Sequence, residues 1–328
     1  MILCSPSINR AADKPPAADL VTDGQKIDLN SPRYQGLFKE LRLRYDFDQE
    51  ELNRIFSGVT IKKEILERMD DQYEALPYYR YRPIFITESR IEKGRKKLAD
   101  HEKLLDSIEE EFGVEREIIV AIWGIESHYG DYHEDGHQLF RTLNTLFDAY
   151  PRRRTFYRKQ LIDFLLLCRN NNVDIHSVKG SYGGAFGQPQ FIPSSFQEYA
   201  RDFDGDGKRD VWDSVPDILA SIANYLHRFQ WVYDAPIYHD IGPELKSQEL
   251  KKAYKQGRQG KVSRQQIMTA QGLTIPSAPE NKKLTVVGLE QKDGNIRFVA
   301  GYPNFQAITA WNHSNNYAMV VSELAMEF

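Results

Sequence analysis

Apolar residues recur every three or four positions along most of the chain, which is the spacing of one face of a helix. Leu37 and Leu41 share a face of a first segment, and the same spacing returns over residues 61–69. A third helix is expected over residues 88–111, and we expect Gly113 to end it. The pattern therefore predicts a largely helical fold.

Prolines and polar residues interrupt this pattern. Residues 76–86 contain two prolines and a dense run of Tyr and Arg, which predicts an irregular surface segment. Past Pro151 a long helix is expected over residues 153–170. Ser194 is expected to cap a further helix, with Gln197 at the capping-box position.

The only strong β signal lies near the C-terminus. Residues 284–289 and 296–300 are rich in apolar and β-branched residues and flank a Lys-Asp-Gly-Asn turn, so they predict a hairpin. Residues 311–324 return to helical spacing. The expected fold class is therefore mainly α, of the α+β type, with a small antiparallel β insert near the C-terminus.

Composition narrows the functional classes. The chain has 328 residues, of which 41% are hydrophobic, and a mean hydropathy of −0.57, values that indicate a soluble globular protein. No apolar run approaches the length of a membrane-spanning helix. The 43 basic residues nearly balance the 47 acidic ones, so no overall field favours nucleic acid as a partner.

The N-terminus and the cysteines carry a further prediction. Residues 1–32 contain few large apolar residues, which is typical of a flexible tail. Two cysteines are too few to define a disulfide framework, and Cys168 lies on an apolar helix face where a structural thiol is expected. No charged n-region and no apolar h-region precede Cys4, so a signal peptide is not expected here, but Cys4 follows Met-Ile-Leu, as in the remnant of a lipoprotein signal. We therefore consider a lipid anchor on Cys4.

Glu126 is the most informative candidate for chemistry, because it ends an otherwise apolar helix. Ile119, Ile122 and Trp123 precede it by three, four or seven residues and share its face. Burial among such neighbours disfavours the charged carboxylate, which raises its pKa and suits it to donate a proton near neutral pH. The alternative is an ordinary helix-terminal Glu that points into solvent or pairs with a nearby Arg.

The segment from Asp202 to Asp213 has the spacing of a calcium-binding loop. Hard calcium ions need several oxygen ligands from one short loop, and Gly207 stands where such loops turn sharply. The last position is Asp rather than Glu, so a modest affinity is expected, and the alternative is a solvated acidic turn. The ion would be structural, bracing two helices, and its ligands would be Asp202, Asp204, Asp206, the Lys208 carbonyl and Asp213.

Two other patterns are less specific. The string from His133 to His137 matches the H-E-x-x-H motif of zinc peptidases, but Gly136 lies inside it and no apolar helix flanks it, so zinc is disfavoured. Residues 180–193 are rich in Gly, which permits either close approach to a ligand or a packed turn. From spacing alone, both interpretations of this glycine-rich segment remain open.

Taken in order, these motifs resemble the B family of membrane-bound lytic murein transglycosylases. The resemblance rests on Glu126-Ser-His-Tyr-Gly130, Gly184-Ala-Phe-Gly-Gln-Pro-Gln-Phe-Ile-Pro-Ser-Ser195, the calcium loop and Asn224-Tyr-Leu226. It implies a lysozyme-like core between a helical lobe and a small β lobe. The expected divisions are a tail at 1–32, a helical lobe at 33–105, the core with its calcium loop at 106–232, a helical and β lobe at 233–303, and a C-terminal helix at 304–328.

The resemblance also implies a set of site residues. Glu126 corresponds to the family's single catalytic acid/base, and the calcium-loop residues correspond to its metal ligands. Trp311 stands where a Tyr is expected, which bears on saccharide preference rather than on the type of reaction. The residues that correspond to the glycan groove are Ser181, Gln190, Tyr225, Trp311, Asn312 and Tyr317.

The implied activity is cleavage of peptidoglycan between N-acetylmuramic acid and N-acetylglucosamine, with formation of a 1,6-anhydro ring. Calcium is the expected cofactor, and glycan strands are the expected partner. The protein is expected to be a monomer in the periplasm, where a lipid anchor could tether it to the outer membrane. A hydrolytic muramidase would instead need a second acid, for which Asp131, Glu134 and Asp135 are nearest in sequence. A glycan-binding module without catalysis is the remaining alternative.

Overall fold

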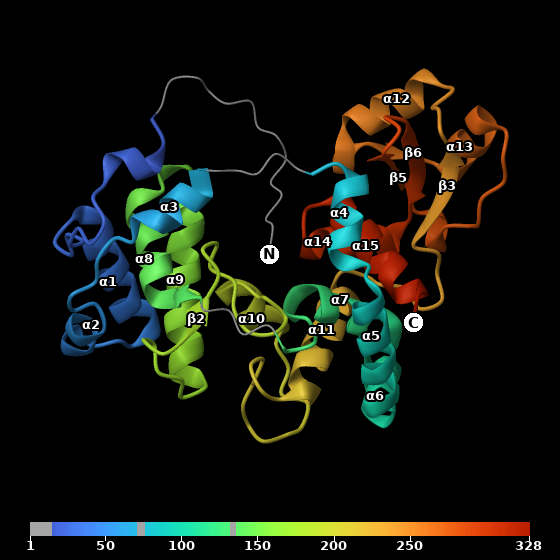
Figure 1. Ribbon diagram of the computed structural model, residues 1–328. Coiled ribbons are helices and arrows are strands. Elements are labelled where there is room, and N and C mark those ends of the chain that lie inside the picture. Colours follow the sequence, from blue (N-terminus) through green and yellow to red (C-terminus); the bar gives the residue numbers. More distant parts are fainter. Residues whose placement is uncertain (1–14, 71–75, 132–135) are drawn as a thin grey trace. The chain divides into compact units, whose positions relative to one another are not determined.

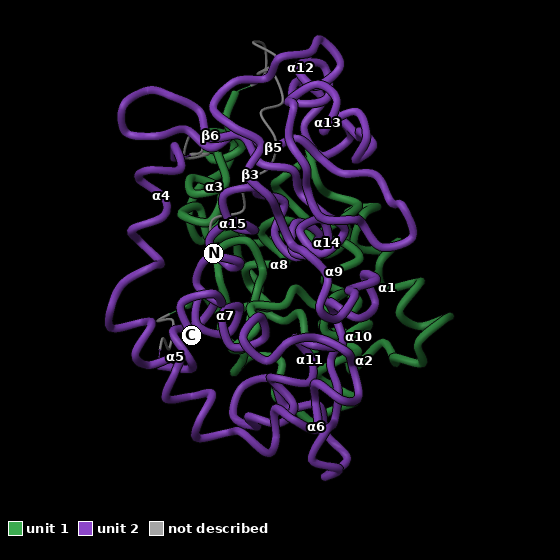
Figure 2. The backbone as a smooth tube through the Cα atoms, turned by 90° about the vertical axis from the view of Figure 1, so that its right-hand side faces the viewer, with its two compact units in different colours: residues 1, 9–72, 133–199 green, residues 2–8, 73–132, 200–328 purple. Residues whose placement is uncertain are grey.

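The computed structural model describes residues 15–70, 76–131 and 136–328 (Figure 1). The chain forms two compact units, and each is assembled from separate stretches of sequence (Figure 2). Unit 1 contains the described residues 15–70 and 136–199, and unit 2 contains 76–131 and 200–328. Among the described residues, none of the helices has the length and apolar character needed to cross a membrane.

Unit 1 is built around two long helices that pack side by side, α8 and α9 (Figure 1). Leu143 and Leu146 of α8 and Leu161 and Leu165 of α9 are fully buried, as the helical spacing predicts. The helices are α1 (Pro32–Tyr45), α2 (Gln49–Ile55), α3 (Lys63–Asp70), α8 (Leu139–Ala149), α9 (Arg154–Asn170), α10 (Pro193–Tyr199) and the short η1 (Ala17–Leu20) and η2 (Pro151–Arg153); β1 (His137–Gln138) pairs antiparallel with β2 (Lys179–Gly180).

The expected flexible tail is wrong for the part that the structure describes. Ala17 and Ala18 are buried, and the Ala18 N–H donates a hydrogen bond to Asp70 at the end of α3 over 3.1 Å. The Ile27 N–H likewise donates to the Val59 carbonyl over 3.2 Å. Small side chains close to the backbone let this polar stretch pack, so residues 15–31 belong to unit 1. Residues 1–14 lie outside the described part of the chain.

Unit 2 combines a helical bundle with a four-stranded antiparallel sheet of order β3-β6-β5-β4. The hairpin expected from the sequence is confirmed as β5 and β6, and β3 and β4 extend it on either side. The strands are β3 (Tyr238–Gly242), β4 (Lys261–Val262), β5 (Leu284–Glu290) and β6 (Ile296–Gly301). The helices are α4 (Tyr78–Phe85), α5 (Glu88–Asp100), α6 (Glu102–Phe112), α7 (Arg116–Ser127), α11 (Val215–Arg228), α12 (Gln248–Lys255), α13 (Arg264–Gln271), α14 (Pro303–Trp311), α15 (Asn315–Met326) and the short η3 (Gly257–Gln259) and η4 (Pro279–Asn281).

Three helix predictions need correction. Residues 78–85 form α4 rather than an irregular segment, because α4 packs on α15 and Arg82 pairs with Glu323 over 2.6 Å. The helix expected over residues 88–111 is interrupted at His101, although Gly113 does end it in a left-handed conformation. The helix expected over residues 311–324 is likewise broken between α14 and α15.

Ser194 does not cap α10, which is a further correction. The helix already begins at Pro193, and the Ser194 N–H donates to the side-chain oxygen of Gln160 on α9 over 2.9 Å. A contact between two helices of unit 1 therefore replaces the local capping box.

α7 lies at the centre of unit 2 and packs against α5, α11 and α15. Its Ile119 and Ile122 are fully buried. Gly124 is required in this helix, because a Cβ at that position would lie 2.5 Å from the ring of Tyr129. The helix ends at Ser127, and the next residue, His128, has a left-handed backbone conformation. Glu126 therefore lies in the last turn of α7.

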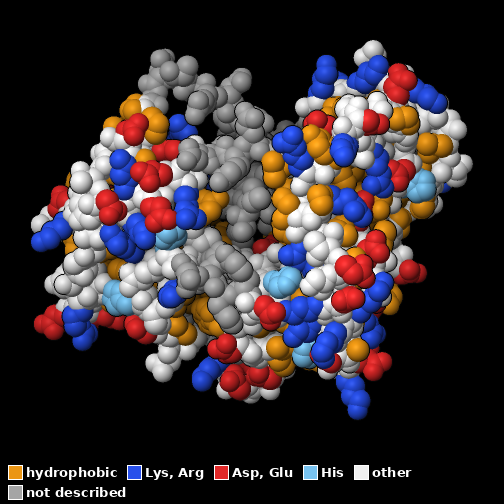
Figure 3. All heavy atoms as spheres, in the orientation of Figure 1, with side chains coloured by type: hydrophobic (Ala, Val, Ile, Leu, Met, Phe, Trp, Pro, Cys, Tyr) orange, Lys and Arg blue, Asp and Glu red, His pale blue; other side chains and the backbone are white. Residues whose placement is uncertain are grey.

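The surface of the face drawn in Figure 3 mixes acidic and basic side chains, with one local exception. Acidic side chains gather at the lower edge of the view, over the loop that Figure 1 draws before α11. This loop contains Asp202, Asp204, Asp206 and Asp213.

Candidate active site

Glu126 is held by hydrogen bonds from two side chains that are far away in sequence. The Trp311 indole Nε1 donates to Glu126 Oε1 over 2.9 Å, and the Tyr317 hydroxyl donates to the same oxygen over 2.7 Å. Trp311 is the last residue of α14, and Tyr317 lies in the first turn of α15. Both donors and the acid belong to unit 2.

Aromatic packing fixes the position of the Trp311 ring. The Tyr225 ring of α11 contacts it edge-on, with 4.6 Å between the ring centroids, and also stacks on the Phe229 ring. The Tyr225 hydroxyl also donates to the Ala310 carbonyl over 2.8 Å. Asn312 follows directly and is buried. The structure therefore brings together four of the predicted site residues and the predicted acid.

Burial raises the pKa of Glu126, and the hydrogen bonds from Tyr317 and Trp311 offset part of that rise. Burial, followed by the neighbouring Glu126, raises the pKa of the Tyr317 hydroxyl well above its ordinary value, so this group keeps its proton. The Trp311 N–H can only donate. Because both groups donate to Oε1, the proton of a protonated carboxyl group belongs on Oε2. The arrangement suits Glu126 to be a proton donor.

The surroundings of Glu126 do not match the alternative of a solvent-facing or Arg-paired helix terminus. In the described part of unit 2, its carboxyl group accepts hydrogen bonds from the neutral donors Trp311 and Tyr317. Asp131, the nearest described candidate for a second acid, is exposed and forms an ion pair with Lys93, which lowers its pKa. Asp131 is therefore an ionised surface group, and Glu134 and Asp135 lie outside the described residues.

Ser181 and Gln190 belong to the glycine-rich segment of unit 1. The Ser181 N–H donates to the Ala185 carbonyl over 2.7 Å, and the Ala185 N–H returns a bond to Ser181 Oγ over 3.0 Å. A Cβ at Gly180 would lie 2.5 Å from the Ala185 carbonyl, so only glycine fits there. These contacts agree with a packed turn, and the expected contact of Ser181 and Gln190 with glycan stays a prediction.

The zinc string is not helical where it is described. His137 lies in strand β1, whereas zinc peptidases need both imidazoles on one helix. His133, Glu134 and Asp135 lie outside the described residues, as does Cys4. Cys168 is buried, in agreement with a structural thiol.

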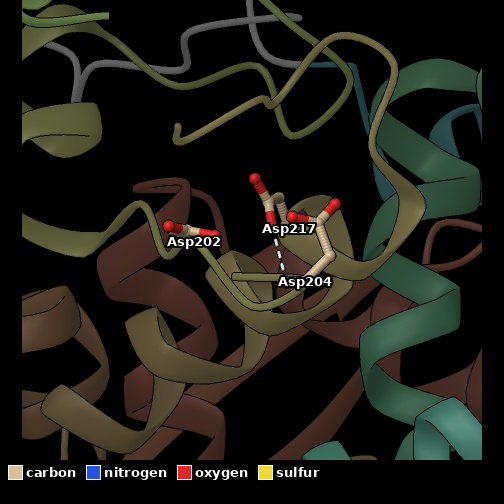
Figure 4. Close-up of side chains that lie close together, drawn as sticks. All are labelled: Asp202, Asp204 and Asp217. Carbon is tan, nitrogen blue, oxygen red and sulfur yellow. Dashed lines mark hydrogen bonds between the residues drawn. The ribbon is translucent and has the colours of Figure 1, made fainter. Parts of the chain in front are cut away.

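The calcium loop brings three carboxylates together, but they differ from the predicted set. Oxygens of Asp202, Asp204 and Asp217 lie within 4.8 Å of one another (Figure 4). Backbone N–H groups donate to all three carboxylates, and Asp204 accepts from that of Asp206 over 3.2 Å. The N–H groups of Gly205 and Gly207 donate to Asp202 over 2.8 and 2.9 Å.

Sequence analysis did not include Asp217 among the candidate ligands. This residue lies in the first turn of α11, is fully buried, and accepts bonds from the N–H groups of Phe203 and Asp210 over 2.7 and 2.8 Å. Its position near a helix start suggested only a role in starting α11. Asp206 and Asp213 are not among the three converging carboxylates. A group of hard oxygen donors such as Asp202, Asp204 and Asp217 fits calcium.

Comparisons with known proteins agree with this geometry. Residues 30–326 match the family model described as the transglycosylase SLT domain. The chain is 33% identical over 310 residues to membrane-bound lytic murein transglycosylase B of Escherichia coli (strain K12), covering 90% of this chain and 82% of that protein.

Two solved structures are also similar. The Escherichia coli lytic transglycosylase Slt35 in complex with calcium has a TM-score of 0.80 and 32% identity, covering 96% of this chain and 97% of that one. SltB3 of Pseudomonas aeruginosa in complex with NAG-anhNAM-pentapeptide has a TM-score of 0.74 and 30% identity, covering 89% and 78%. The expected fold class, mainly helical with a lysozyme-like core, is confirmed.

Proposed function

The chain belongs to the lytic transglycosylases with an SLT domain, and we propose that Glu126 is the single acid/base with which it cleaves peptidoglycan. The bond cleaved is the β-1,4 linkage between N-acetylmuramic acid and N-acetylglucosamine, and the product carries a 1,6-anhydromuramoyl end. The observation that carries the proposal is a carboxyl group with a raised pKa whose Oε1 receives both neutral donors.

In the first step Glu126 acts as a general acid. Oε2 gives its proton to the glycosidic oxygen, the bond to the muramoyl C1 breaks, and N-acetylglucosamine leaves with the new hydroxyl group. Positive charge develops at C1, where the 2-acetamido group of the same sugar can stabilise it. Glu126 is now a carboxylate, and the bonds from Trp311 and Tyr317 to Oε1 stabilise its negative charge.

In the second step the same carboxylate acts as a base. It removes the proton from the muramoyl C6 hydroxyl, whose oxygen attacks C1 and closes the anhydro ring. The nucleophile is tethered to the reacting sugar, so its effective concentration far exceeds that of an external reactant. Glu126 ends the cycle protonated, and water is not consumed.

A hydrolytic muramidase is less well supported. Such an enzyme needs a second carboxylate, as base or nucleophile, beside the scissile bond. Asp131 is exposed and already paired with Lys93. Among the described candidates, this leaves Glu126 to perform both proton transfers.

The groove and the metal site complete the proposal. Tyr225, Trp311, Asn312 and Tyr317 would contact glycan next to Glu126 in unit 2. Ser181 and Gln190 are proposed as glycan-binding residues of unit 1. Calcium would bind to Asp202, Asp204 and Asp217, with Asp206, the Lys208 carbonyl and Asp213 as the further oxygens expected from the loop spacing. The ion would brace the loop against α11 rather than take part in catalysis.

The substrate also determines where the protein acts. Peptidoglycan lies outside the cytoplasm, which places the activity in the cell envelope. We propose a periplasmic monomer with a lipid anchor on Cys4 that holds it at the outer membrane. Mass spectrometry of the N-terminal peptide from the native host tests the anchor, because an acylated Cys4 carries the added mass of its lipid.

Replacing Glu126 with Gln tests the proposed role. The amide keeps an acceptor for Trp311 and Tyr317 but has no carboxyl proton to transfer, so release of soluble fragments should fall by about a thousandfold or more. Binding to purified cell-wall sacculi should persist. Glu92→Gln is the matched control, because Glu92 is an exposed acid of unit 2. Retained turnover in Glu126→Gln, or loss of binding together with turnover, would contradict the proposal.

A further inference from the structure

A pocket in unit 2 is lined by residues close in sequence to the donors of Glu126. It has a volume of about 240 Å³ and opens between the sheet edge at β4 and the junction of α14 and α15. Apart from Ala310, its lining residues have polar or basic side chains, and none of them is acidic. The residues that matter here are Arg258, Lys261, Gln306, Thr309, His313 and Asn315.

The two cations in this pocket contact a backbone carbonyl, an imidazole and a side-chain amide. Arg258 donates to the Thr309 carbonyl over 3.2 Å and contacts His313 Nδ1 at 2.8 Å, and Lys261 donates to Gln306 Oε1. Within the described part of the chain, neither cation forms a salt bridge with a carboxylate. Arg297 elsewhere in unit 2 shows the contrast, since it pairs with both Asp240 and Glu323.

This arrangement leaves positive charge without a counter-ion. Partial burial and the neighbouring Arg258 lower the pKa of Lys261, because both disfavour its charged form. Arg258 and Lys261 remain more than a third exposed, so a ligand can reach them from solvent. An anion placed between them would offset their mutual repulsion.

The pocket shares a helix with the candidate active site. Gln306, Thr309 and Ala310 of α14 line it. The Ala310 carbonyl also accepts the bond from Tyr225, and the next residue, Trp311, donates to Glu126. A substrate at Glu126 therefore lies beside the same helix end that forms one wall of the pocket.

We propose that Arg258 and Lys261 bind a carboxylate of the peptide that peptidoglycan carries on its muramic acid. The inference rests on the proposed function, because it assigns a second part of the same substrate to this pocket. The hydroxyl and acetamido groups of the glycan are neutral, whereas the peptide carries carboxylates. An Arg can bind a carboxylate through two parallel N–H bonds, and a Lys adds a compact positive charge.

The test compares two substrates with and without the pocket cations. One substrate is glycan strands that carry their peptides. The other is strands from which an amidase has removed the peptides, so that each muramic acid keeps only its lactyl carboxylate. Lys261→Gln should raise KM for peptide-bearing strands about tenfold, the loss expected for one charged hydrogen bond, with kcat unchanged. KM for stripped strands should stay the same, and Lys261→Arg should restore binding.

Arg258→Gln should show the same selective effect, and Lys255→Gln is the matched control. Lys255 is an exposed cation in the last turn of α12, so its loss changes net charge equally without touching the pocket. An equal rise in KM for both substrates, which would indicate recognition of the lactyl group or a structural role, overturns the inference. Unchanged KM for both also overturns it.

The wild-type protein separates this result from failure of the proposed function. If the wild-type protein releases anhydro products from both substrates and the variants have the same KM as the wild type, only the proposed binding of a peptide carboxylate is wrong. If it releases no anhydro product at all, the proposed function itself is wrong.

Discussion

The carboxyl group of Glu126 and the carboxylates of the calcium loop, all in unit 2, differ in the hydrogen-bond donors that hold them. Glu126 stands alone, and its hydrogen-bond donors are side chains 185 and 191 residues further along the chain. Asp202 and Asp217 instead accept bonds from backbone N–H groups no more than 14 residues away. The first arrangement depends on how distant helices pack, and the second depends on the path of one loop.

This difference separates two kinds of chemistry. A lone carboxyl group with a raised pKa and two neutral donors can hold a proton and then give it up. Carboxylates that converge on one point concentrate negative charge, and a divalent cation relieves it. We therefore expect changes in the loop to affect stability, and changes around Glu126 to affect the rate and its pH dependence.

The largest effect in this comparison should come from Asp217→Asn. With calcium at about a hundred times its Kd, binding adds about 2.7 kcal/mol to the free energy of unfolding of the wild-type protein. The variant should lose most of this gain, because it lacks the buried carboxylate with which α11 would bind the ion held by the loop. Thermal unfolding with calcium and with a chelator measures the gain.

Asp234→Asn is the control for that experiment, since it removes an acidic residue of unit 2 outside the calcium loop. Comparing each protein with and without calcium removes any direct effect of the substitution on folding. An unchanged calcium gain in Asp217→Asn would show that the ion does not bind there. If Asp217→Asn also lowered kcat well below its unfolding temperature, the calcium site would affect catalysis as well as stability, which would contradict the separate roles of the two sites.

Tyr317→Phe should lower kcat by about tenfold, since one hydrogen bond to a charged group contributes roughly 1.5 kcal/mol. The bond matters most once Glu126 is ionised, and the variant keeps the ring. Tyr302→Phe is the matched control, because the buried Tyr302 donates its hydroxyl to the Pro276 carbonyl rather than to Glu126. Equal rates for Tyr317→Phe and wild type would mean that this bond has no part in catalysis.

Trp311→Phe should move the pH profile. The bond from Trp311 lowers the pKa of Glu126, so its loss lets that pKa rise further. The general acid must be protonated, and kcat/KM falls as the pH rises through this pKa. The alkaline limb of kcat/KM should therefore shift to higher pH in the variant. A shift toward lower pH would contradict the sign of the effect.

Asp131→Asn should have the smallest effect, less than about twofold on kcat, because an exposed ion pair contributes little. Release of soluble fragments from sacculi measures it. A loss of a hundredfold or more would instead identify Asp131 as the second carboxylate of a hydrolase.

The same contrast explains what could be predicted from the sequence. The apolar stripe of Ile119, Ile122 and Trp123 indicated an acid among apolar neighbours at Glu126, since all four residues lie on one helix, but an ordinary helix-terminal Glu stayed open until the other motifs were added. The calcium loop was predicted because its oxygen-bearing residues follow a fixed local spacing, and two of them, Asp202 and Asp204, belong to the converging group. Asp217 was missed because its role depends on how α11 folds back over the loop.

Long-range contacts account for the remaining errors. No local pattern indicates that Trp311 and Tyr317 share Oε1 of Glu126, although the family resemblance placed both residues in the groove. The prolines of residues 76–86 suggested an irregular segment, but packing on α15 stabilises a helix there. Strand β4 has only two residues and becomes recognisable through its pairing with β5.

The central claim is that one carboxyl group performs both proton transfers and that no water enters the product. Digestion of sacculi in water labelled with the heavy isotope of oxygen tests this directly by mass spectrometry of the soluble fragments. The account predicts fragments one water lighter than hydrolysed ones, without heavy oxygen and resistant to reduction at the muramoyl end. Reducible fragments that carry one heavy oxygen at that end would contradict it and would require a second catalytic carboxylate.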